Sequence, residues 1–261
     1  MGSAHAQARL WGAAARDFGE VAEPLSQPLH EATLAALSPL SGLRLLDVGC
    51  ATGLALQMAA GHGARVTGLD ATKAMIDIAH ERLPHARFHV ADLQDLPFDD
   101  GTFDVITAFN AIQYAAEPKS ATAELARVAR PGGRVAIGVW ADPARCDTEV
   151  LFQRIRALAP APPGAHAPLA ISVPGTVETL LADAGLVQTA SGEVSCPFIY
   201  PDLATGWRGQ ASIGPFRRAI EIAGETTVRD VFDNVLEQYR QPDGTYRQDN
   251  VFRYVIADKP A

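Results

Sequence analysis

The chain has 261 residues, of which 48% are apolar and 20% charged, and its formal net charge is −8. This balance is typical of a globular protein with a large core, built as one α/β domain with or without a small cap. The acidic charge and the lack of a basic run argue against nucleic acid and anionic membrane as partners.

The cysteine and histidine patterns predict neither a structural disulfide nor a metal site. Cys50, Cys146 and Cys196 are scattered without a CxxC pair, and no HExxH motif is present. Such usage indicates a reducing compartment. No apolar run reaches the roughly 18 residues of a membrane span, and residues 1–11 lack the regions of a signal peptide. We therefore expect a cytoplasmic protein.

The first forty residues are expected to form a helical cap segment, 1–40. Residues 9–18 are good helix formers, and residues 28–37 carry apolar side chains at helical spacing. Ser38-Pro39 ends the second helix, because a residue that precedes proline avoids the α region.

An alternating pattern of strands and helices follows. Short apolar runs predict strands at residues 43–49, 64–70, 86–92, 103–110 and 134–140, with helices between most of them. This order predicts a doubly wound parallel sheet with right-handed crossovers. Ligands of such sheets bind beyond the carboxyl ends of the strands, so the residues that end each strand are the candidates for a site.

The pattern changes after Trp140. We expect a helix at 147–158, a Pro/Ala-rich loop at 159–168, a helix at 176–186 and a long strand at 186–198. A mostly helical piece at 201–241 and a last strand at 252–259 close the chain. The predicted core is therefore residues 41–200 and 251–261, and residues 201–250 form an inserted helical lid over the carboxyl edge of the sheet.

Three strand ends offer polar groups to this edge. DVGCATG, residues 47–53, ends the first strand, and its glycines allow a tight turn close to a ligand, with the N–H groups of the next helix pointing at the ligand's polar end. Asp70 ends the second strand about twenty residues later, where a ribose-binding carboxylate is expected. Asp92 follows the third strand and could accept a hydrogen bond from an adenine amino group. Taken singly, Asp70 could be a helix cap and Asp92 a turn residue.

Together, these three strand ends predict a site for a nucleoside. Two other classes of nucleotide-binding protein fit the sequence less well. A nicotinamide dehydrogenase would carry GxGxxG, but this chain has no glycine two places after Gly49. A P-loop is absent, because no GK[ST] follows. No NPPY tetrapeptide is present, which argues against methylation of a flipped base.

Five segments together resemble a known family. DVGCATG, GLD, VADLQDLPF, FDVITAFNAIQY and ELARVARPGGRVAIGVW resemble, in order and spacing, the motifs of class I S-adenosylmethionine-dependent methyltransferases, in particular the branch of the ubiquinone and menaquinone C-methyltransferases. The resemblance runs from Leu43 to Trp140. It implies a Rossmann-like sheet of seven strands, the last of them antiparallel and supplied by residues 252–259, and S-adenosyl-L-methionine as cofactor.

The resemblance also implies roles for individual residues. Asp47 and the backbone of residues 49–51 would hold the amino-acid end of the cofactor, Asp70 the ribose, and Asp92 with Leu93 the adenine. Asn110 would lie beside the methionine portion. The family commonly has glycine where this chain has Ala51, and a negative φ there would leave binding intact. The expected cofactor-binding residues are Trp11, Asp47, Gly49, Cys50, Ala51, Gly53, Asp70, Ala71, Met75, Asp92, Leu93 and Asn110.

Substrate-facing residues are expected just after the fourth strand, at Gln113 and Tyr114. Relatives often carry a histidine pair near here, so this departure argues against a histidine base at this position. Trp11 and Phe18 are expected to cap the cofactor. An apolar acceptor pocket is expected from aromatic and proline residues of the lid region, namely residues 197–201, Trp207 and Phe216.

The predicted function is methyl transfer to oxygen, nitrogen or carbon of a small hydrophobic or aromatic metabolite of secondary metabolism. It would proceed by in-line attack with proximity and desolvation, in a monomer or homodimer. One alternative is a relative that keeps S-adenosylmethionine but runs a non-methylating reaction. The other is a non-catalytic binding module, against which the complete set Asp47, Asp70 and Asp92 argues.

Overall fold

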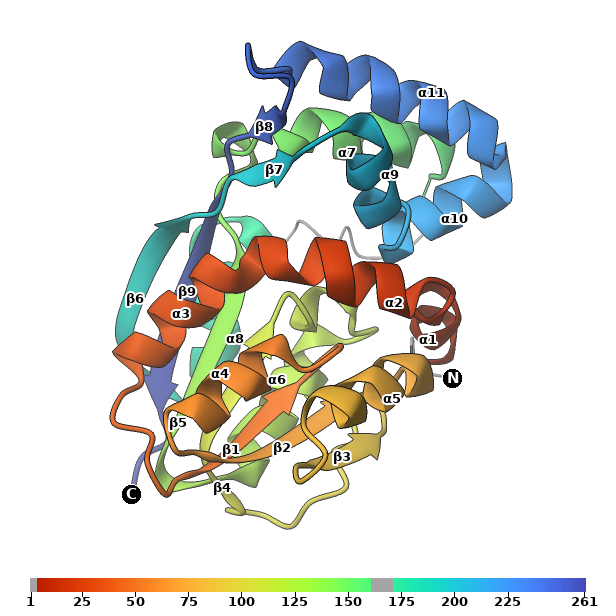
Figure 1. Cartoon of the computed structure of the whole chain (residues 1–261). Helices are drawn as coiled ribbons and strands as arrows, with labels where there is room; N and C mark the ends of the chain where they lie inside the picture. The colour runs from red at the N-terminus through yellow and green to blue at the C-terminus, as the bar shows by residue number, and fades with distance from the viewer. Residues whose placement is uncertain (1–3, 161–170) are drawn as a thin grey trace.

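The computed structural model describes residues 4–160 and 171–261, and it is built around one large sheet (Figure 1). The seven strands lie in the order β3-β2-β1-β4-β5-β9-β6. They are β1 (Arg44–Val48), β2 (Arg65–Asp70), β3 (Arg87–Val90), β4 (Phe103–Phe109), β5 (Ala129–Trp140), β6 (Val187–Ser195) and β9 (Val251–Asp258).

Strand directions confirm the predicted Rossmann-like sheet. β1 pairs in parallel with both β2 and β4, and β4 pairs in parallel with β5. β9 runs antiparallel to β5 and to β6, between which it lies. The strand order reverses between β1 and β4, so the carboxyl ends of these two strands form the switch point at which such sheets bind ligands.

Helices cover both faces of the sheet (Figure 1). One face carries α3 (Gln27–Ala36), α4 (Leu54–Gly61) and α5 (Lys73–Arg82), and the other carries α6 (Pro118–Val128) and α8 (Thr176–Asp183). Alternate strand residues point to opposite faces. Leu45 therefore packs in the core under α3 and α4, and its neighbour Leu46 packs in the core under α6 and α8.

The N-terminal segment is a chain of short helices. In place of the single helix expected over 9–18, α1 (Ala4–Gly12) ends at a glycine, and α2 (Ala15–Asp17) continues into a π-helical turn η1 (Phe18–Ala22) and a 3₁₀ turn η2 (Glu23–Ser26) before α3 begins. Figure 1 shows this run passing between the sheet and a second group of helices. Single π turns are frequently found at functional sites.

That second group is the lid, built from α7 (Thr148–Leu158), α9 (Leu203–Gln210), α10 (Gly214–Ala223) and α11 (Glu225–Leu236). Although α7 precedes β6 in the chain, it packs against α10 and α11. A two-stranded sheet, β7 (Phe198–Tyr200) with β8 (Tyr246–Gln248), closes the lid.

The long strand expected at 186–198 is therefore wrong in its extent. It is divided into β6 and β7 at Cys196-Pro197, because proline has no N–H to give to a ladder. Residues 161–168 of the predicted Pro/Ala-rich loop lie outside the described residues. None of the helices within 4–160 and 171–261 is long and apolar enough to cross a membrane.

Candidate functional site

A pocket of about 1390 Å³, its open mouth included, lies at the carboxyl ends of the strands. Its wall is polar where β1, β2 and β3 end and aromatic where β5 meets the lid. All the predicted cofactor residues except Gly53 line it, as do Gln113 and Tyr114.

The glycine turn after β1 is held by the end of β2. Gly49 N and Cys50 N both donate to the carbonyl oxygen of Leu69, at 2.7 and 3.0 Å. Gly49 has a φ of +77°, and a Cβ built there would lie 2.4 Å from the Cβ of Ala111. Only glycine lets the two loops touch in this way.

The N–H groups of this turn do not point at a ligand, which corrects the sequence prediction. Those of Gly49 and Cys50 are paired with Leu69, and that of Ala51 donates to Asp70 Oδ2 at 3.0 Å. The N–H of Thr52 donates to Glu23 Oε1 at 3.1 Å. The N–H groups of these four residues are therefore bound within the protein and are not available to a ligand.

Ala51 occupies a conformation that glycine normally supplies. Its φ is +45°, so the negative φ under which an alanine would be tolerated without strain is not found here. The left-handed region costs an alanine about 1–2 kcal/mol, because Cβ approaches the following carbonyl oxygen. The hydrogen bond from its N–H to Asp70 holds the residue there.

Gly53 has a packing role rather than a place in the pocket wall. It is the N-cap residue of α4 with a φ of +85°, and a Cβ at this position would lie 3.2 Å from that of Ala79. Gly53 is thus the one predicted cofactor residue that does not line the pocket, because it faces α5.

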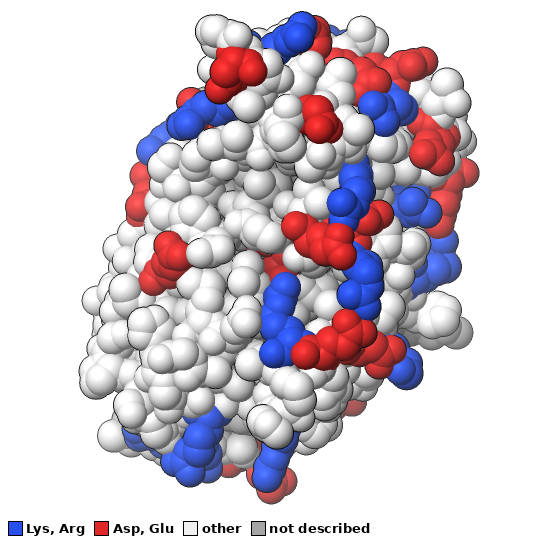
Figure 2. Space-filling view, in the orientation of Figure 1, with Lys and Arg blue, Asp and Glu red and all other residues white. Residues whose placement is uncertain are grey.

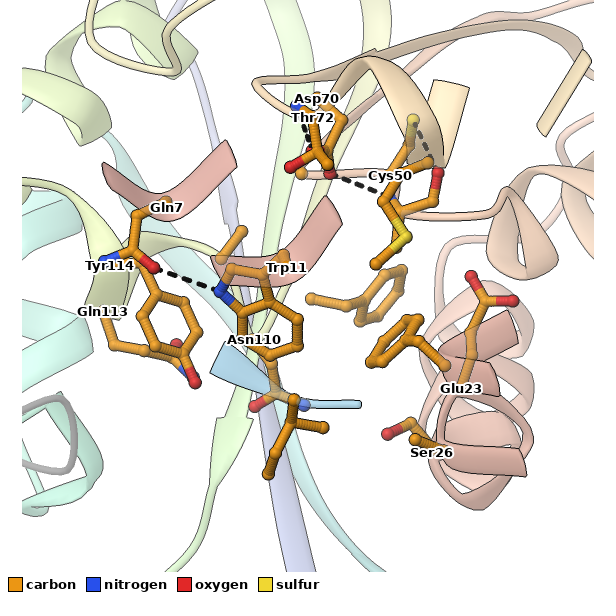
Figure 3. Close-up of a pocket in the computed structure, with 18 of the residues that line it drawn as sticks. Gln7, Trp11, Glu23, Ser26, Cys50, Asp70, Thr72, Asn110, Gln113 and Tyr114 are labelled. Carbon is orange, nitrogen blue, oxygen red and sulfur yellow. Dashed lines mark hydrogen bonds between the residues drawn. The ribbon is translucent and has the colours of Figure 1, made fainter. Parts of the chain in front are cut away.

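Asp70 braces the turn and lines the pocket at once. Its Oδ2 accepts from Ala51 N and its Oδ1 from Thr72 N, at 3.0 and 2.8 Å (Figure 3). Burial raises the pKa of Asp70, and the hydrogen bonds from Thr72 and Ala51 oppose that rise. Each carboxylate oxygen keeps acceptor capacity for a further donor.

Asp47 is fully enclosed at the end of β1. Burial raises its pKa to about 7, against the effect of the 2.7 Å hydrogen bond from Thr107 Oγ1, while the charges of Glu23 and Asp70 raise it further. Three carboxyl groups thus stand near one another at this end of the pocket. Such a cluster favours a cation over an anion.

Glu23 is the residue that the sequence prediction missed. It is 5% exposed and reaches from η2 to accept from Thr52 N and, at 3.4 Å, Leu54 N, and it pairs with Arg82 at 2.6 Å. It therefore ties the N-terminal segment to the start of α4 and to α5. An acidic residue amid the apolar VAEPL stretch was the available signal, because an acid in such a position is rarely buried without a partner.

Asp92 and its neighbours form the far end of the polar wall. Asp92 Oδ1 accepts a hydrogen bond from Gln94 N at 2.9 Å. This bond is expected if Asp92 serves as a turn residue, which was the alternative interpretation of its position. The residue nevertheless lines the pocket together with Leu93, Ala71 and Met75. One carboxylate can make the turn bond and still accept from a ligand.

Aromatic side chains of the N-terminal segment lie across the pocket. The Trp11 ring contacts those of Phe18 and Tyr114, with centroids 5.5 and 5.3 Å apart. Its Nε1 donates to Gln7 Oε1 at 3.0 Å (Figure 3). A Cβ on Gly214 would lie 2.6 Å from Trp11 Nε1, so the start of α10 packs directly on this ring.

The substrate-facing candidates follow β4 on the turn η3 (Ile112–Tyr114). Burial raises the pKa of Tyr114, and a hydrogen bond with Gln113 opposes the rise, so this phenol stays protonated at neutral pH. Asn110 has a φ of +49° and donates its N–H to Gly138 O at 2.8 Å. Within the described residues, Asn110 Oδ1 and Gln113 Oε1 are buried without a hydrogen-bond partner.

The aromatic half of the pocket is built around Trp140. Its ring centroid lies 4.2 Å from that of Phe252, 5.6 Å from Phe198 and 5.7 Å from Phe152. Phe198 is the one predicted pocket residue of the 197–201 stretch that lines this wall.

The other aromatics predicted for the acceptor pocket lie elsewhere, which corrects that prediction. Tyr200, Trp207 and Phe216 are buried in the core of the lid, and Ile199 is 49% exposed. The apolar character of the three buried side chains, Tyr200, Trp207 and Phe216, therefore serves packing within the lid.

Comparison with known proteins agrees with this architecture. Residues 46–137 match the sequence family described as a methyltransferase domain. The malonyl-(acyl-carrier protein) O-methyltransferase of Erwinia pyrifoliae is 30% identical over 209 residues, which cover 80% of this chain and 76% of the relative. The YcgJ protein of Bacillus subtilis, a solved structure, shares the fold with a TM-score of 0.62 at 18% identity, over 89% of this chain and 98% of its own.

The demethylmenaquinone methyltransferase of Clavibacter sepedonicus is 36% identical over 115 residues, which are 43% of this chain and 47% of the relative. The chain thus spans about half the length of this and similar curated relatives. The Erwinia relative is covered over three quarters of its length. The chain therefore belongs to the class I S-adenosylmethionine-dependent methyltransferases, and S-adenosylmethionine is its cofactor.

Proposed function

We propose that this protein methylates a small, apolar or aromatic metabolite at oxygen, nitrogen or carbon. The observation that carries the proposal is the division of one pocket into two halves. The polar half, around Asp47, Asp70 and Asp92, suits a cationic nucleoside, and the aromatic half, around Trp140, suits an acceptor without charge.

The residues of the polar half fit S-adenosylmethionine. The cofactor carries an ammonium group, a ribose diol and an adenine amino group, all of which are hydrogen-bond donors. The wall offers the matching acceptors: Asp47 and the carbonyls of the glycine turn for the ammonium, Asp70 for the diol, and Asp92 for the adenine. The unpartnered Asn110 Oδ1 would meet the methionine portion.

S-adenosylmethionine supplies a methyl group already activated by a positively charged sulfur. The protein has then to hold the acceptor in line and to exclude water. Trp11, Phe18 and Tyr114 would cover the cofactor, and the faces of such rings also stabilise a neighbouring positive charge. We assign this covering role to segment 1–40, and the closing role to lid 201–250 together with α7.

The acceptor class is supported by the lining and by one relative. The Clavibacter relative is named for demethylmenaquinone, which is a molecule of aromatic and apolar character. We also propose that the protein acts in the cytoplasm, as part of secondary metabolism, as a monomer or homodimer on a free small molecule. Figure 2 shows acidic and basic side chains interspersed on the visible face, without the basic band that nucleic acid requires.

A labelling experiment tests this function. Purified protein is incubated with S-adenosylmethionine that carries a deuterated methyl group and with cell extract, and the products are separated by mass spectrometry. We expect labelled methyl groups on apolar or aromatic metabolites, with S-adenosylhomocysteine formed in equal amount. Label found on highly polar metabolites alone would refute the proposed acceptor class, and turnover without S-adenosylhomocysteine would indicate a non-methylating reaction.

A further inference from the structure

The aromatic half of the pocket contains two polar side chains that the proposed methyl transfer leaves without a role. His30 reaches the pocket from α3, and Gln210 reaches it from the end of α9 in the lid. Both are enclosed, with 5% and 4% of their surface exposed. They line the pocket together with apolar side chains such as Leu25, Phe198 and Phe252, and the His30 ring centroid lies 4.5 Å from that of Phe109.

Each of these side chains has a buried atom without a hydrogen-bond partner among the described residues, namely His30 Nδ1 and Gln210 Oε1. Leaving a buried polar atom unpaired costs about 1–3 kcal/mol. Buried polar groups in native proteins are nearly always satisfied, so an unpaired one points to a partner that binds there. Packing alone would be served better by apolar side chains at both positions.

The chemistry of the missing partner follows from what is already bound. Gln210 Nε2 donates to Tyr200 Oη at 2.9 Å, which leaves its oxygen to accept. Burial lowers the pKa of His30 to about 4, so the ring is neutral at pH 7 and has one nitrogen that accepts and one that donates. Gln113 Oε1 is a second unpaired oxygen on the same pocket. The partner has to bring hydrogen-bond donors to these two oxygens.

The charge of the missing partner is also constrained. The described residues that line the pocket include no lysine or arginine, whereas three aspartates and Glu23 are among them. An acceptor molecule with a carboxylate or phosphate would lose its hydration here without gaining a lysine or arginine as partner, so only the cofactor's own positive charges would offset a cost of several kcal/mol. The side chains of the lining therefore disfavour an anionic acceptor.

We propose that His30 and Gln210 bind the methyl acceptor, and that the acceptor is a neutral molecule with an aromatic or apolar body and at least one hydroxyl or N–H group. This rests on the proposed function, since it names the substrate class of the same site. His30 belongs to the N-terminal segment and Gln210 to the lid. A molecule that hydrogen-bonds to both joins the two covers of the pocket, so a donor group on the acceptor favours the closed arrangement.

Three naphthalene probes test the proposal by calorimetric titration into protein saturated with S-adenosylhomocysteine. 2-Naphthol carries a donor, 2-methoxynaphthalene has the same body without one, and 2-naphthoate carries a negative charge. We expect 2-naphthol to bind about ten-fold more tightly than either of the others, the factor for one hydrogen bond of ordinary strength. Equal affinities, a preference for naphthoate, or no binding of any probe would overturn the proposal.

Variants then test whether the preference for 2-naphthol depends on His30 and Gln210. His30→Phe and Gln210→Met keep the side-chain volume and remove the acceptor atom, and each should reduce the preference for 2-naphthol over 2-methoxynaphthalene at least three-fold. His62→Phe, at an exposed position after α4, should leave the preference unchanged. A preference that persists in both pocket variants would overturn the assignment to these residues.

The proposed function and the proposed class of acceptor can be contradicted independently of each other. Affinity for S-adenosylhomocysteine is measured first on every protein, and its absence from the unmodified protein would contradict the proposed function itself. Where it is intact, the ranking of the probes bears on the acceptor alone. The ranking in the unmodified protein decides the proposal even where a variant does not fold.

Discussion

Ala51 is the residue at which this chain departs most from the family pattern, and its conformation makes the departure testable. With a φ of +45°, it sits where glycine is favoured. We expect Ala51→Gly to stabilise the protein by about 0.5–1 kcal/mol, because relief of strain exceeds the added freedom of the unfolded chain. Urea denaturation measures the change. Ala60→Gly in the helix α4 is the control and should destabilise by about 1 kcal/mol. A destabilised Ala51→Gly variant would contradict the conclusion that Ala51 is strained.

Asp47 makes the stability of the cofactor-free protein depend on pH. Its pKa in the folded protein is about 7, above its ordinary value of 3.8, so between these values the folded state keeps a proton that the unfolded chain releases. Stability is therefore lost as pH rises through this window. We expect the unmodified protein to lose about 2–4 kcal/mol between pH 5 and pH 8 relative to Asp47→Asn. Denaturation of both proteins at the two pH values checks this, and parallel curves would refute it.

Asp70 has two functions that can be separated experimentally. Asp70→Ala should weaken binding of S-adenosylhomocysteine by about 1–3 kcal/mol, the range for losing a charged hydrogen bond. It also removes the brace on Ala51 and Thr72, so thermal stability has to be measured alongside. Unchanged affinity in a folded variant would show that Asp70 braces the turn and does not contact the ribose.

At the scale of elements, the attachment of the N-terminal segment depends on one buried ion pair and several exposed ones. Glu23 and Arg82 have side chains that are 6% and 20% exposed. The pairs of Arg208 with Asp17 and Glu20 are solvent-exposed. Figure 2 shows acidic and basic side chains alternating along the side of the molecule where α2, α5 and α9 lie.

Burial makes these pairs unequal in energy. Glu23→Ala should lower the free energy of unfolding by about 3–5 kcal/mol, because it leaves Arg82 and the N–H groups at the start of α4 without their partner. Arg208→Ala, the exposed counterpart, should cost less than about 1 kcal/mol. Urea denaturation of both variants checks the contrast. A Glu23→Ala variant no less stable than Arg208→Ala would mean that the segment is held by its apolar contacts alone.

At the scale of the whole molecule, the sheet was predictable and the lid only in part. The parallel strands are mainly apolar runs, which is a local signal, and β1, β2 and β4 lie where the sequence places them. The pairing of β7 with β8 and the packing of α7 on α10 and α11 join segments far apart in the chain. No local pattern records such contacts, and Pro197 was the one residue that could have revealed the end of β6.

The site shows the same division between local and non-local signals. The positions of Asp47, Asp70 and Asp92 follow from strand ends, and all three line the pocket. The backbone of the turn was not predictable, because its N–H groups are bound by Leu69, Asp70 and Glu23, which lie outside the motif. His30 and Gln210 likewise come from helices whose sequences gave no sign of facing one pocket.

The measurement that tests the central claim most directly is calorimetric titration of the purified protein with S-adenosylmethionine, S-adenosylhomocysteine and NAD. We expect both sulfur nucleosides to bind with micromolar dissociation constants, which correspond to a binding free energy of about −8 kcal/mol, and NAD not to bind. Binding of NAD, or of neither sulfur nucleoside, would contradict the assignment of Asp47, Asp70 and Asp92 to the cofactor.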